Sequence, residues 1–238
     1  MVAHTIIVGE HSLPLTIRKH PRSRRMIIRY QPLRHTVMLT LPPYVTVRQG
    51  LSFIEARQAW IAAQIKEHAA TVMLADGVVI PVLGTPLTIR HVGGRGVLRV
   101  VGDELHVPGN AAFLSRRLYD WLKRRVKEEI AMLAHAKGRT IGKKVIKIGL
   151  RDTSSHWGSC NSRGCLSFSW RLVFAPYAVL EYVVSHEVAH LACLDHSPTF
   201  WQVVASLSPD YLSHRAWLKA NGHALYRFSR VGKNSMSG

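Results

Sequence analysis

The sequence predicts an α+β protein in which a β-rich N-terminal region precedes a domain built around one apolar helix. Short β-branched runs, separated by Gly, Pro or charged residues, recur through the first 110 residues. One helical pattern, with apolar residues every three or four positions, interrupts these runs, and a second one follows them. Further along, an apolar helical segment carries His186 and His190 four positions apart, which places both on one helix face.

Four strands and one helix are expected in the first 72 residues. The strands are predicted at residues 4–8, 15–19, 26–30 and 36–41. Pro42 and Pro43 end this run, because proline lacks the backbone N–H that a strand ladder uses. Thr46 and Gln49 form a predicted capping box, which opens a helix that reaches about Val72.

The same succession of elements is predicted a second time. The run Pro-Leu-Thr-Ile-Arg at residues 14–18 recurs unchanged at residues 86–90. Two further strands follow, at 97–101 and 104–107. A helix then begins behind the N-cap Asn110 and ends near Lys137, with Gly138 as the residue after it. We therefore predict a duplication of a β-hairpin-plus-helix unit.

The C-terminal part is predicted to alternate strands and helices. Strands are expected at 144–151 and 165–170, with a turn at 161–164 before the second. A helix is expected from about Tyr177 to Leu194. Ser197 and Pro198 suit an N-cap and a first helical position, so another helix begins there. The last residues, 229–238, are expected to form a flexible tail.

Composition excludes several classes of protein. Hydrophobic residues make up 47% of the 238-residue chain, which is typical of a folded globular protein. No run of about 18 apolar residues occurs, so we expect no transmembrane helix. The three cysteines, Cys160, Cys165 and Cys193, are too few for a disulfide scaffold, and the N-terminus does not resemble a signal peptide. These features predict a cytoplasmic protein.

Positive charge is concentrated in two parts of the chain, and the formal net charge is +18. Residues 111–150 hold 11 Lys and Arg against 3 Asp and Glu, a balance of +8. A second cluster has no acidic residue and consists of Arg18, Lys19, Arg22, Arg24, Arg25, Arg29 and Arg34. We predict that these surfaces bind nucleic acid or another polyanion, with a merely solubilising basic face as the alternative.

The pattern His-Glu-x-x-His at residues 186–190 predicts a metal site. Both imidazoles lie on one helix face, and His196 follows six residues later, where the chain can turn back to supply a third nitrogen. Three nitrogen ligands and one open position suit a catalytic Zn²⁺ ion. Glu187 is then the candidate catalytic base that takes a proton from the zinc-activated water. Cys193 is an alternative fourth ligand, but it is more typical of a packed small hydrophobe.

These motifs resemble the YgjP-like metallopeptidase family, which is related to the SprT and WLM zinc proteases. The resemblance rests on His-Glu-x-x-His, on Trp-Gly-Ser-Cys at 157–160, on Trp-Arg-Leu at 170–172 and on His-Ser-x-x-Phe-Trp at 196–201. It implies a zincin-like catalytic domain, with His186, His190 and His196 as metal ligands and Glu187 as general base. It also implies protein or peptide substrates and a metalloendopeptidase activity.

Two regions precede the predicted tail at residues 229–238. Residues 1–110 are expected to form a β-rich region with one helix that recruits substrate, and residues 111–228 a zincin-like metallopeptidase domain. Two other functions stay open. One is a metal-dependent hydrolase of a non-peptide bond, such as a nucleotide phosphoanhydride, and the other a polyanion-binding module with a vestigial metal site.

Several supporting roles are also predicted. The strand at 165–170 is expected to pair with an extended substrate peptide. The candidates for stabilising the oxyanion are Tyr211, His214 and His223, and those for orienting the ligand imidazoles are Asp152, Glu181 and Asp195.

Overall fold

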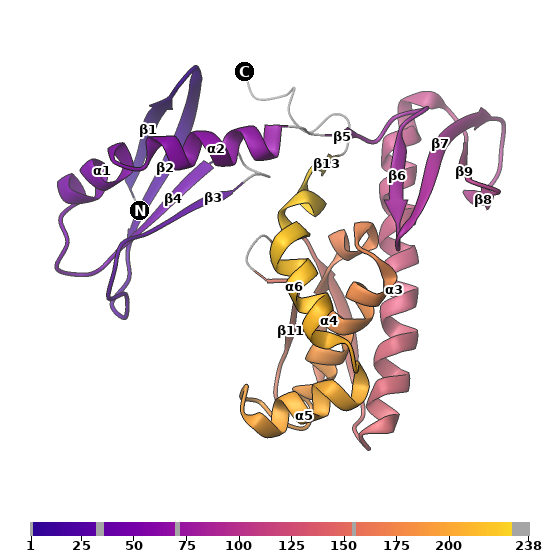
Figure 1. The fold of residues 1–238 in the computed structure, drawn as a ribbon. Helices are drawn as coiled ribbons and strands as arrows, with labels where there is room; N and C mark the ends of the chain where they lie inside the picture. Colours follow the sequence, from indigo (N-terminus) through magenta and orange to yellow (C-terminus); the bar gives the residue numbers. More distant parts are fainter. Residues whose placement is uncertain (1, 32–35, 70–71, 154–155, 230–238) are drawn as a thin grey trace. The chain divides into compact units, whose positions relative to one another are not determined.

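The computed structural model describes residues 2–31, 36–69, 72–153 and 156–229 (Figure 1). Arg34 of the basic cluster and nearly all of the predicted tail lie outside these ranges. The chain divides into two compact units, Met1–Thr71 and Val72–Gly238, and each is described by itself. Within the described ranges, no helix has both the length and the apolar character of a membrane span.

The first unit is a four-stranded sheet covered on one face by two helices (Figure 1). The strand order is β1-β2-β4-β3, with β2 and β4 parallel and the other neighbours antiparallel. Alternate strand residues, such as Leu15, Ile17 and Leu39, are buried in one core with residues of the helices. The four predicted strands are confirmed as β1 (Val2–Val8), β2 (His11–Lys19), β3 (Ile27–Gln31) and β4 (Thr36–Leu41).

Two helices stand where one was predicted. The capping box is confirmed, because the Thr46 side chain accepts from the backbone of Gln49 and the Gln49 side chain accepts from the backbone of Thr46. The single helix to Val72 is wrong: α1 (Val47–Glu55) ends, and α2 (Gln58–Ala69) begins anew. All residues from 55 to 60 are exposed, so no continuous apolar stripe holds one long helix against the sheet.

The second unit begins with a sheet that repeats the topology of the first. Its order is β6-β7-β9-β8, again with one parallel pair, β7 and β9, between two antiparallel pairs. In the parallel pairs, Ile17 faces Leu39 in the first sheet, and Ile89 faces Leu105 in the second. This shared order supports the predicted duplication. The strands are β6 (Val79–Val82), β7 (Thr85–Gly93), β8 (Arg99–Val101) and β9 (Glu104–Pro108).

The long helix α3 (Leu114–Thr140) starts and ends differently from the prediction. Asn110 caps a short 3-10 turn, Ala111–Phe113, which leads into α3. Gly138 does not follow the helix but lies buried inside it, and Gly142, with a φ of +65°, follows the helix end. A Cβ on Gly138 would lie 2.9 Å from the carbonyl oxygen of Lys143. Gly138 is therefore explained by close packing of the chain that leaves the helix.

The remaining elements surround a three-stranded sheet of order β10-β12-β11, which includes the predicted turn at 161–164. Its strands are β10 (Lys147–Arg151), β11 (Gly158–Cys160) and β12 (Cys165–Ser169). A 3-10 segment, η3 (Trp170–Phe174), leads from the sheet into α4. The helices are α4 (Tyr177–Ala189), α5 (Pro198–Leu207) and α6 (Tyr211–Asn221), and the chain closes with η4 (Gly222–Tyr226) and with β13 (Phe228–Ser229) paired to β5 (Val72–Met73).

Helix α4 ends five residues before the predicted Leu194. His190 is its C-cap residue, and the next amides, Leu191 and Ala192, bond to carbonyls only three residues back. Such bonds tighten the last turn and end the α-helix. Leu194 is 67% exposed, so no burial of its side chain favours a longer helix.

The compact units divide at residues 71 and 72 rather than at residue 110. Ile89 and Leu105 of the second sheet share one continuous core with Phe168 and Leu180. The second sheet therefore belongs to the unit that contains α4, and not to an N-terminal region. The proposed division of roles between residues 1–110 and 111–228 stays a prediction.

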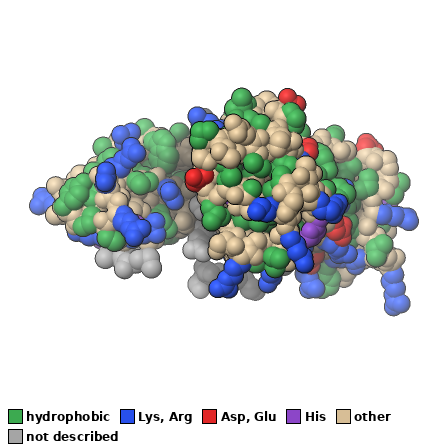
Figure 2. Space-filling model, turned by 90° about the horizontal axis from the view of Figure 1, so that it is seen from below, with side chains coloured by type: hydrophobic (Ala, Val, Ile, Leu, Met, Phe, Trp, Pro, Cys, Tyr) green, Lys and Arg blue, Asp and Glu red, His purple; other side chains and the backbone are tan. Residues whose placement is uncertain are grey.

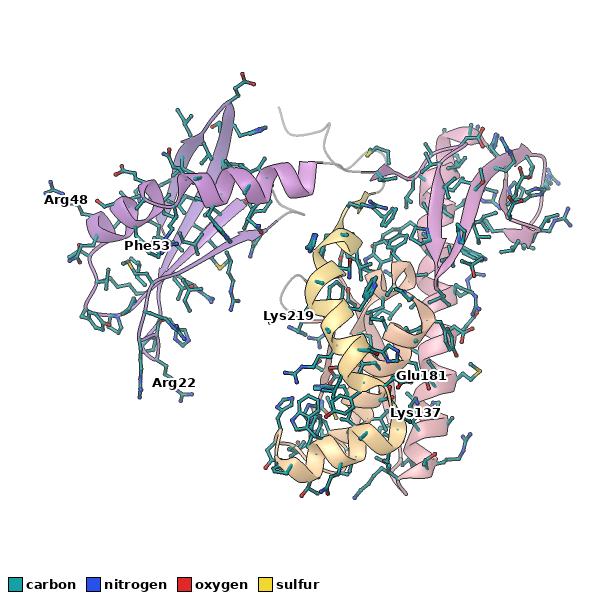
Figure 3. All side chains as sticks on the ribbon, viewed as in Figure 1. Arg22, Arg48, Phe53, Lys137, Glu181 and Lys219 are labelled. Carbon is teal, nitrogen blue, oxygen red and sulfur yellow. The ribbon has the colours of Figure 1, made fainter. Side chains whose placement is uncertain are left out.

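The partly buried Lys137 and the buried Arg171 hold the helices and the C-terminal segment around this core. Lys137 of α3 donates to Glu181 of α4 at 2.8 Å and to the carbonyl of Leu207 of α5 at 2.6 Å, and the first contact can be followed in Figure 3. Arg171, which is 3% exposed, donates to Asp152 at 2.8 Å and to the carbonyl of Phe228 at 3.0 Å. Each cation bridges segments far apart in sequence, and its partners compensate its burial.

Replacing Gly138 by Ala tests the packing at the end of α3. An exposed helical Gly→Ala change usually stabilises by about 1 kcal/mol. Here we expect destabilisation of about 1–3 kcal/mol, because the added methyl meets the Lys143 carbonyl. Denaturant unfolding measures the change, with the exposed Ala136→Gly in the same helix as a control for propensity. A stabilised Gly138→Ala variant would contradict the close approach.

Candidate metal centre

Helix α4 positions the first two histidines. Nine of its thirteen residues are buried, so its orientation is fixed by packing on nearly every side. His186 lies in the last turn and His190 caps the end. Their spacing of four residues places both rings on one face, and the ring centroids are 5.0 Å apart.

The turn after α4 returns the third histidine to the same place. The side chain of Ser197 caps α5 by accepting from the backbone of Phe200, and Asp195 accepts from the backbone N–H of Ser197. His196 is held between these two contacts. The candidate ligand atoms of His186, His190 and His196 all lie within 4.8 Å of one another.

The spacing of the nitrogens fits a tetrahedral metal ion. The Nε2 atoms of His186 and His196 are 3.2 Å apart. Two nitrogens bound tetrahedrally to Zn²⁺ at 2.0–2.1 Å would lie about 3.3 Å apart. Three imidazoles are also a donor set that zinc prefers. The residues present therefore fit such an ion without a large rearrangement of these two rings.

Burial keeps His186 and His190 in the form that binds metal. It lowers the pKa of His186 to about 4, with further lowering by the charges of His190, His196 and Arg215. Burial also lowers the pKa of His190. Neutral rings offer lone pairs at neutral pH, whereas protonated rings would not.

A backbone carbonyl, rather than a carboxylate, orients His190. Nδ1 of His190 lies 3.0 Å from the carbonyl oxygen of Cys193. Because a carbonyl only accepts, Nδ1 carries the proton and Nε2 keeps its lone pair for a metal. The three carboxylates expected in this role accept from other groups: Asp152 from Arg171, Glu181 from Lys137 and Asp195 from Ser197.

The ring of Phe200 packs against all three histidine rings. It is fully buried, and its ring centroid lies 5.0, 4.5 and 4.8 Å from those of His186, His190 and His196. Phe200 is thus a residue of the hydrophobic core. It is also part of the site, because it limits where the three rings can lie.

Glu187 is packed against the backbone of β11. It is 6% exposed, and burial raises the pKa of its carboxyl to about 8. A Cβ on Gly158 would lie 2.5 Å from both Cγ and Oε1 of Glu187. Only glycine leaves room for the carboxyl here, which gives the Gly of the Trp-Gly-Ser-Cys motif a physical role.

A comparison with known families agrees with this geometry. The family model described as the YgjP-like metallopeptidase domain matches residues 24–221, which is most of the chain. The chain belongs to this family. The predicted resemblance is confirmed, and membership indicates a metal-dependent peptidase with protein or peptide substrates. Comparison with curated proteins and with solved structures gave no match.

The YgjP-like match extends across both compact units. It begins before β3, crosses the division at residues 71 and 72 and ends with α6. Part of the first sheet therefore belongs to the family domain, together with the candidate metal centre. The match does not include β1 and β2.

Of the three oxyanion candidates, Tyr211 has the contacts that lead to the site. It stacks on Trp201 with centroids 5.4 Å apart, and Trp201 lies 5.7 Å from His186. Nδ1 of His214 is buried without a partner among the described residues, and His223 is exposed.

Arg215 is a residue that the sequence analysis missed. Its guanidinium lies 4.8 Å from the centroid of the Trp201 ring, and its charge contributes to the lowered pKa of His186. The sequence feature that could have indicated it is the spacing: Arg215 lies one helical turn after Tyr211, which places both residues on one face of α6.

The cysteines do not add a metal-binding group. All three are free. Burial, and then the charges of Glu187 and Cys165, raise the pKa of Cys160 to about 11. A protonated thiol is a poor metal ligand. Cys193 contributes its carbonyl to His190, and the described residues that gather at metal-binding distance are the three histidines.

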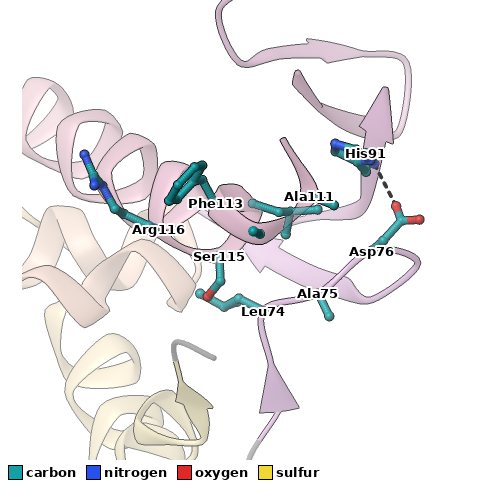
Figure 4. Close-up of a pocket in the computed structure, with 10 residues that line it drawn as sticks. Leu74, Ala75, Asp76, His91, Ala111, Phe113, Ser115 and Arg116 are labelled. Carbon is teal, nitrogen blue, oxygen red and sulfur yellow. Dashed lines mark hydrogen bonds between the residues drawn. The ribbon is translucent and has the colours of Figure 1, made fainter. Parts of the chain in front are cut away.

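A hollow that none of His186, His190 and His196 lines lies beside the start of α3 (Figure 4). It measures about 660 Å³ and is lined by Asp76, His91 and Phe113, among others. Asp76 accepts from the backbone of His91, and Nε2 of His91 lies 2.6 Å from the carbonyl oxygen of Gly109. These polar groups are satisfied within the protein, so the hollow shows no catalytic arrangement.

Replacing His190 tests the proposed ligand set. We expect the purified protein to bind about one zinc per chain, and His190→Ala to lose most of it, because two remaining imidazoles hold zinc poorly. Elemental analysis after dialysis gives the stoichiometry. His135→Ala, which removes an exposed imidazole from α3, is the control and should retain the metal. Full zinc content in His190→Ala would refute the site.

Proposed function

We propose that the protein is a zinc metalloendopeptidase in which His186, His190 and His196 hold the ion and Glu187 is the general base. The observation that carries the proposal is the gathering of three imidazole ligand atoms within 4.8 Å at the end of α4, where Glu187 adjoins the first of them. Bound zinc supplies a Lewis acid that polarises a carbonyl and lowers the pKa of water.

The environment of Glu187 suits a group that exchanges protons at neutral pH. Burial favours its protonated form, so the carboxyl can accept a proton and later release it to a leaving amine. Gly158 lies directly against the carboxyl and holds it in place. The carboxyl that accepts and releases the proton therefore has a fixed position beside the histidines.

The strand offered to a substrate is β11, and not the strand predicted from the sequence. The predicted strand, β12, lies between β10 and β11 and uses both of its edges. Among the described strands of this sheet, β11 lies at an edge and contains Gly158 beside Glu187. We propose that an extended peptide pairs antiparallel with β11, which places its backbone next to the proposed base.

The basic surface supports a polyanion partner, although it is smaller than the sequence suggested. Lys137 is partly buried and pairs with Glu181, and Arg125 pairs with Glu129. Arg124 and Lys127 of α3 are exposed, as are Arg22 and Arg24 of the first unit. Lys and Arg side chains dominate the charged groups on the face shown in Figure 2. A polyanion held there would raise the local concentration of substrates attached to it.

The location in the cytoplasm stays a prediction, supported by three free cysteines.

Glu187→Gln tests the proposed base. The amide has nearly the same size but cannot accept a proton, so we expect full zinc content and peptide cleavage reduced by at least about 100-fold. Cleavage of a quenched-fluorescence peptide library, read by mass spectrometry, measures the loss. Near wild-type turnover would exclude this role. If the wild type cleaves nucleotide phosphoanhydrides and no peptide, the non-peptide hydrolase is the correct function.

Reversing two charges on α3 tests the polyanion surface. We expect Arg124→Glu with Lys127→Glu to weaken binding to labelled RNA and DNA, and to flatten the dependence of affinity on salt, because fewer counterions are released. Zinc content should not change. Absence of binding by the wild type at low salt would remove nucleic acid as a partner.

A further inference from the structure

A second hollow, of about 370 Å³, adjoins the candidate metal centre. Its wall includes His190, so it opens beside the histidines themselves. The rest of the wall comes from the turn that continues from His190 after α4 and from two further segments, the chain after α3 and the turn between β11 and β12. These segments are fixed to each other, because the N–H of Ile146 donates to the carbonyl of Gly164 at 2.9 Å.

Three cations line this hollow, and none of its lining residues is acidic. They are Lys143, Lys144 and Arg163, all exposed. In the described parts of the chain, no carboxylate pairs with any of them. The nearest acidic residue in sequence to this wall is Asp195, which is engaged at the start of α5. The lining of the hollow is therefore positively charged next to the proposed ligand His190.

The rim of the same hollow is apolar and open to solvent. Ile146 and Leu194 are 60% and 67% exposed, although side chains of this kind are usually buried. Both line the hollow with the three cations. Apolar walls with a few charged groups are typical of sites that fix one side chain of a ligand.

The order of elements places this hollow on one side of the scissile bond. The turn at 161–164 follows β11 directly, and Gly158 at the start of β11 marks the position of Glu187. A peptide antiparallel to β11 runs from the turn toward Gly158. At about 3.4 Å per residue, the hollow lies roughly two to four residues before the bond that is cleaved.

We infer that this hollow is a specificity subsite for an acidic side chain, Asp or Glu, on the N-terminal side of the scissile bond. The inference rests on the proposed peptidase function and names its substrate class. The cations attract the carboxylate, while Ile146 and Leu194 contact the neighbouring apolar part of the peptide. Substrates with Lys or Arg at these positions are disfavoured by like charge.

Binding tests the subsite without requiring turnover. Zinc-loaded Glu187→Gln is titrated with fluorescent peptides that carry Glu, Gln or Lys at the second to fourth positions before a central bond. We expect the Glu peptide to bind on the order of tenfold more tightly than the Gln peptide, and the Lys peptide most weakly. Adding Lys144→Glu and Arg163→Glu should abolish this preference. Equal binding of the Glu and Gln peptides, or an unchanged preference in that variant, would overturn the inference.

A matched charge control and a phosphate competitor complete the binding test. Arg95→Glu with Arg99→Glu changes the net charge equally, and Arg99 lies on β8, at the opposite end of α3 from α5 (Figure 1). The Glu preference should persist in this control. If it disappears there too, net charge rather than the hollow explains it. Displacement by inorganic triphosphate without any preference for the Glu peptide would instead assign the hollow to phosphate.

Cleavage by the wild type separates the two proposals. Enrichment of Asp or Glu two to four residues before the cleaved bonds in a peptide library supports both. Cleavage without this enrichment overturns the subsite and leaves the peptidase function intact. Preferred binding of the Glu peptide with no cleavage of any peptide refutes the peptidase function but retains an acidic-peptide site.

Discussion

The enclosure of α4 by apolar packing is the constraint on which the candidate site depends. The helix is buried against α3, the three-stranded sheet and α5, so it can neither rotate nor slide without opening the core. His186 and Glu187 therefore have fixed directions, one toward the other histidines and one toward β11. The partly buried hydrogen bond from Lys137 to Glu181 ties the same helix to α3. A polar group buried in so apolar a helix costs free energy unless it is hydrogen-bonded, paired with a charge or bound to a metal.

The site is built in layers around that helix. Phe200 packs against the three imidazoles, and the carbonyl of Cys193 selects the tautomer of His190. Gly158 leaves room for the Glu187 carboxyl. Each support comes from a different element, and none is a metal ligand. Arg171 supports the site indirectly. Its buried guanidinium donates to Asp152, which follows β10, and to the carbonyl of Phe228, and so ties the end of β10 to the C-terminal segment. The geometry at the histidines thus depends on contacts spread through the second unit.

The two similar sheets differ in the partner of the arginine that ends the repeated Pro-Leu-Thr-Ile-Arg run. In the second sheet, Arg90 pairs with Glu104, which also lies 2.8 Å from His106. In the first sheet, Arg18 occupies the matching position and donates to the hydroxyl of Thr40, a neutral partner. The charge of Arg90 is thereby balanced in the second sheet, whereas Arg18 in the first sheet keeps its positive charge beside a neutral partner. A duplicated element that keeps its fold can in this way change its surface.

The sequence by itself determined the features that depend on local spacing. The strands of the first sheet, most strands of the second, the capping box at Thr46, the start of α5 and the grouping of His186, His190 and His196 follow from patterns only a few residues long. Tertiary structure decided what depends on distant neighbours. It placed Gly138 within α3, ended α4 at Ala189, and put β12 inside its sheet with β11 at one edge. It also brought Lys143 and Arg163 to the same hollow as His190. The physical reason is that local patterns set backbone conformation, whereas burial, strand order and charge compensation arise only when distant segments pack together.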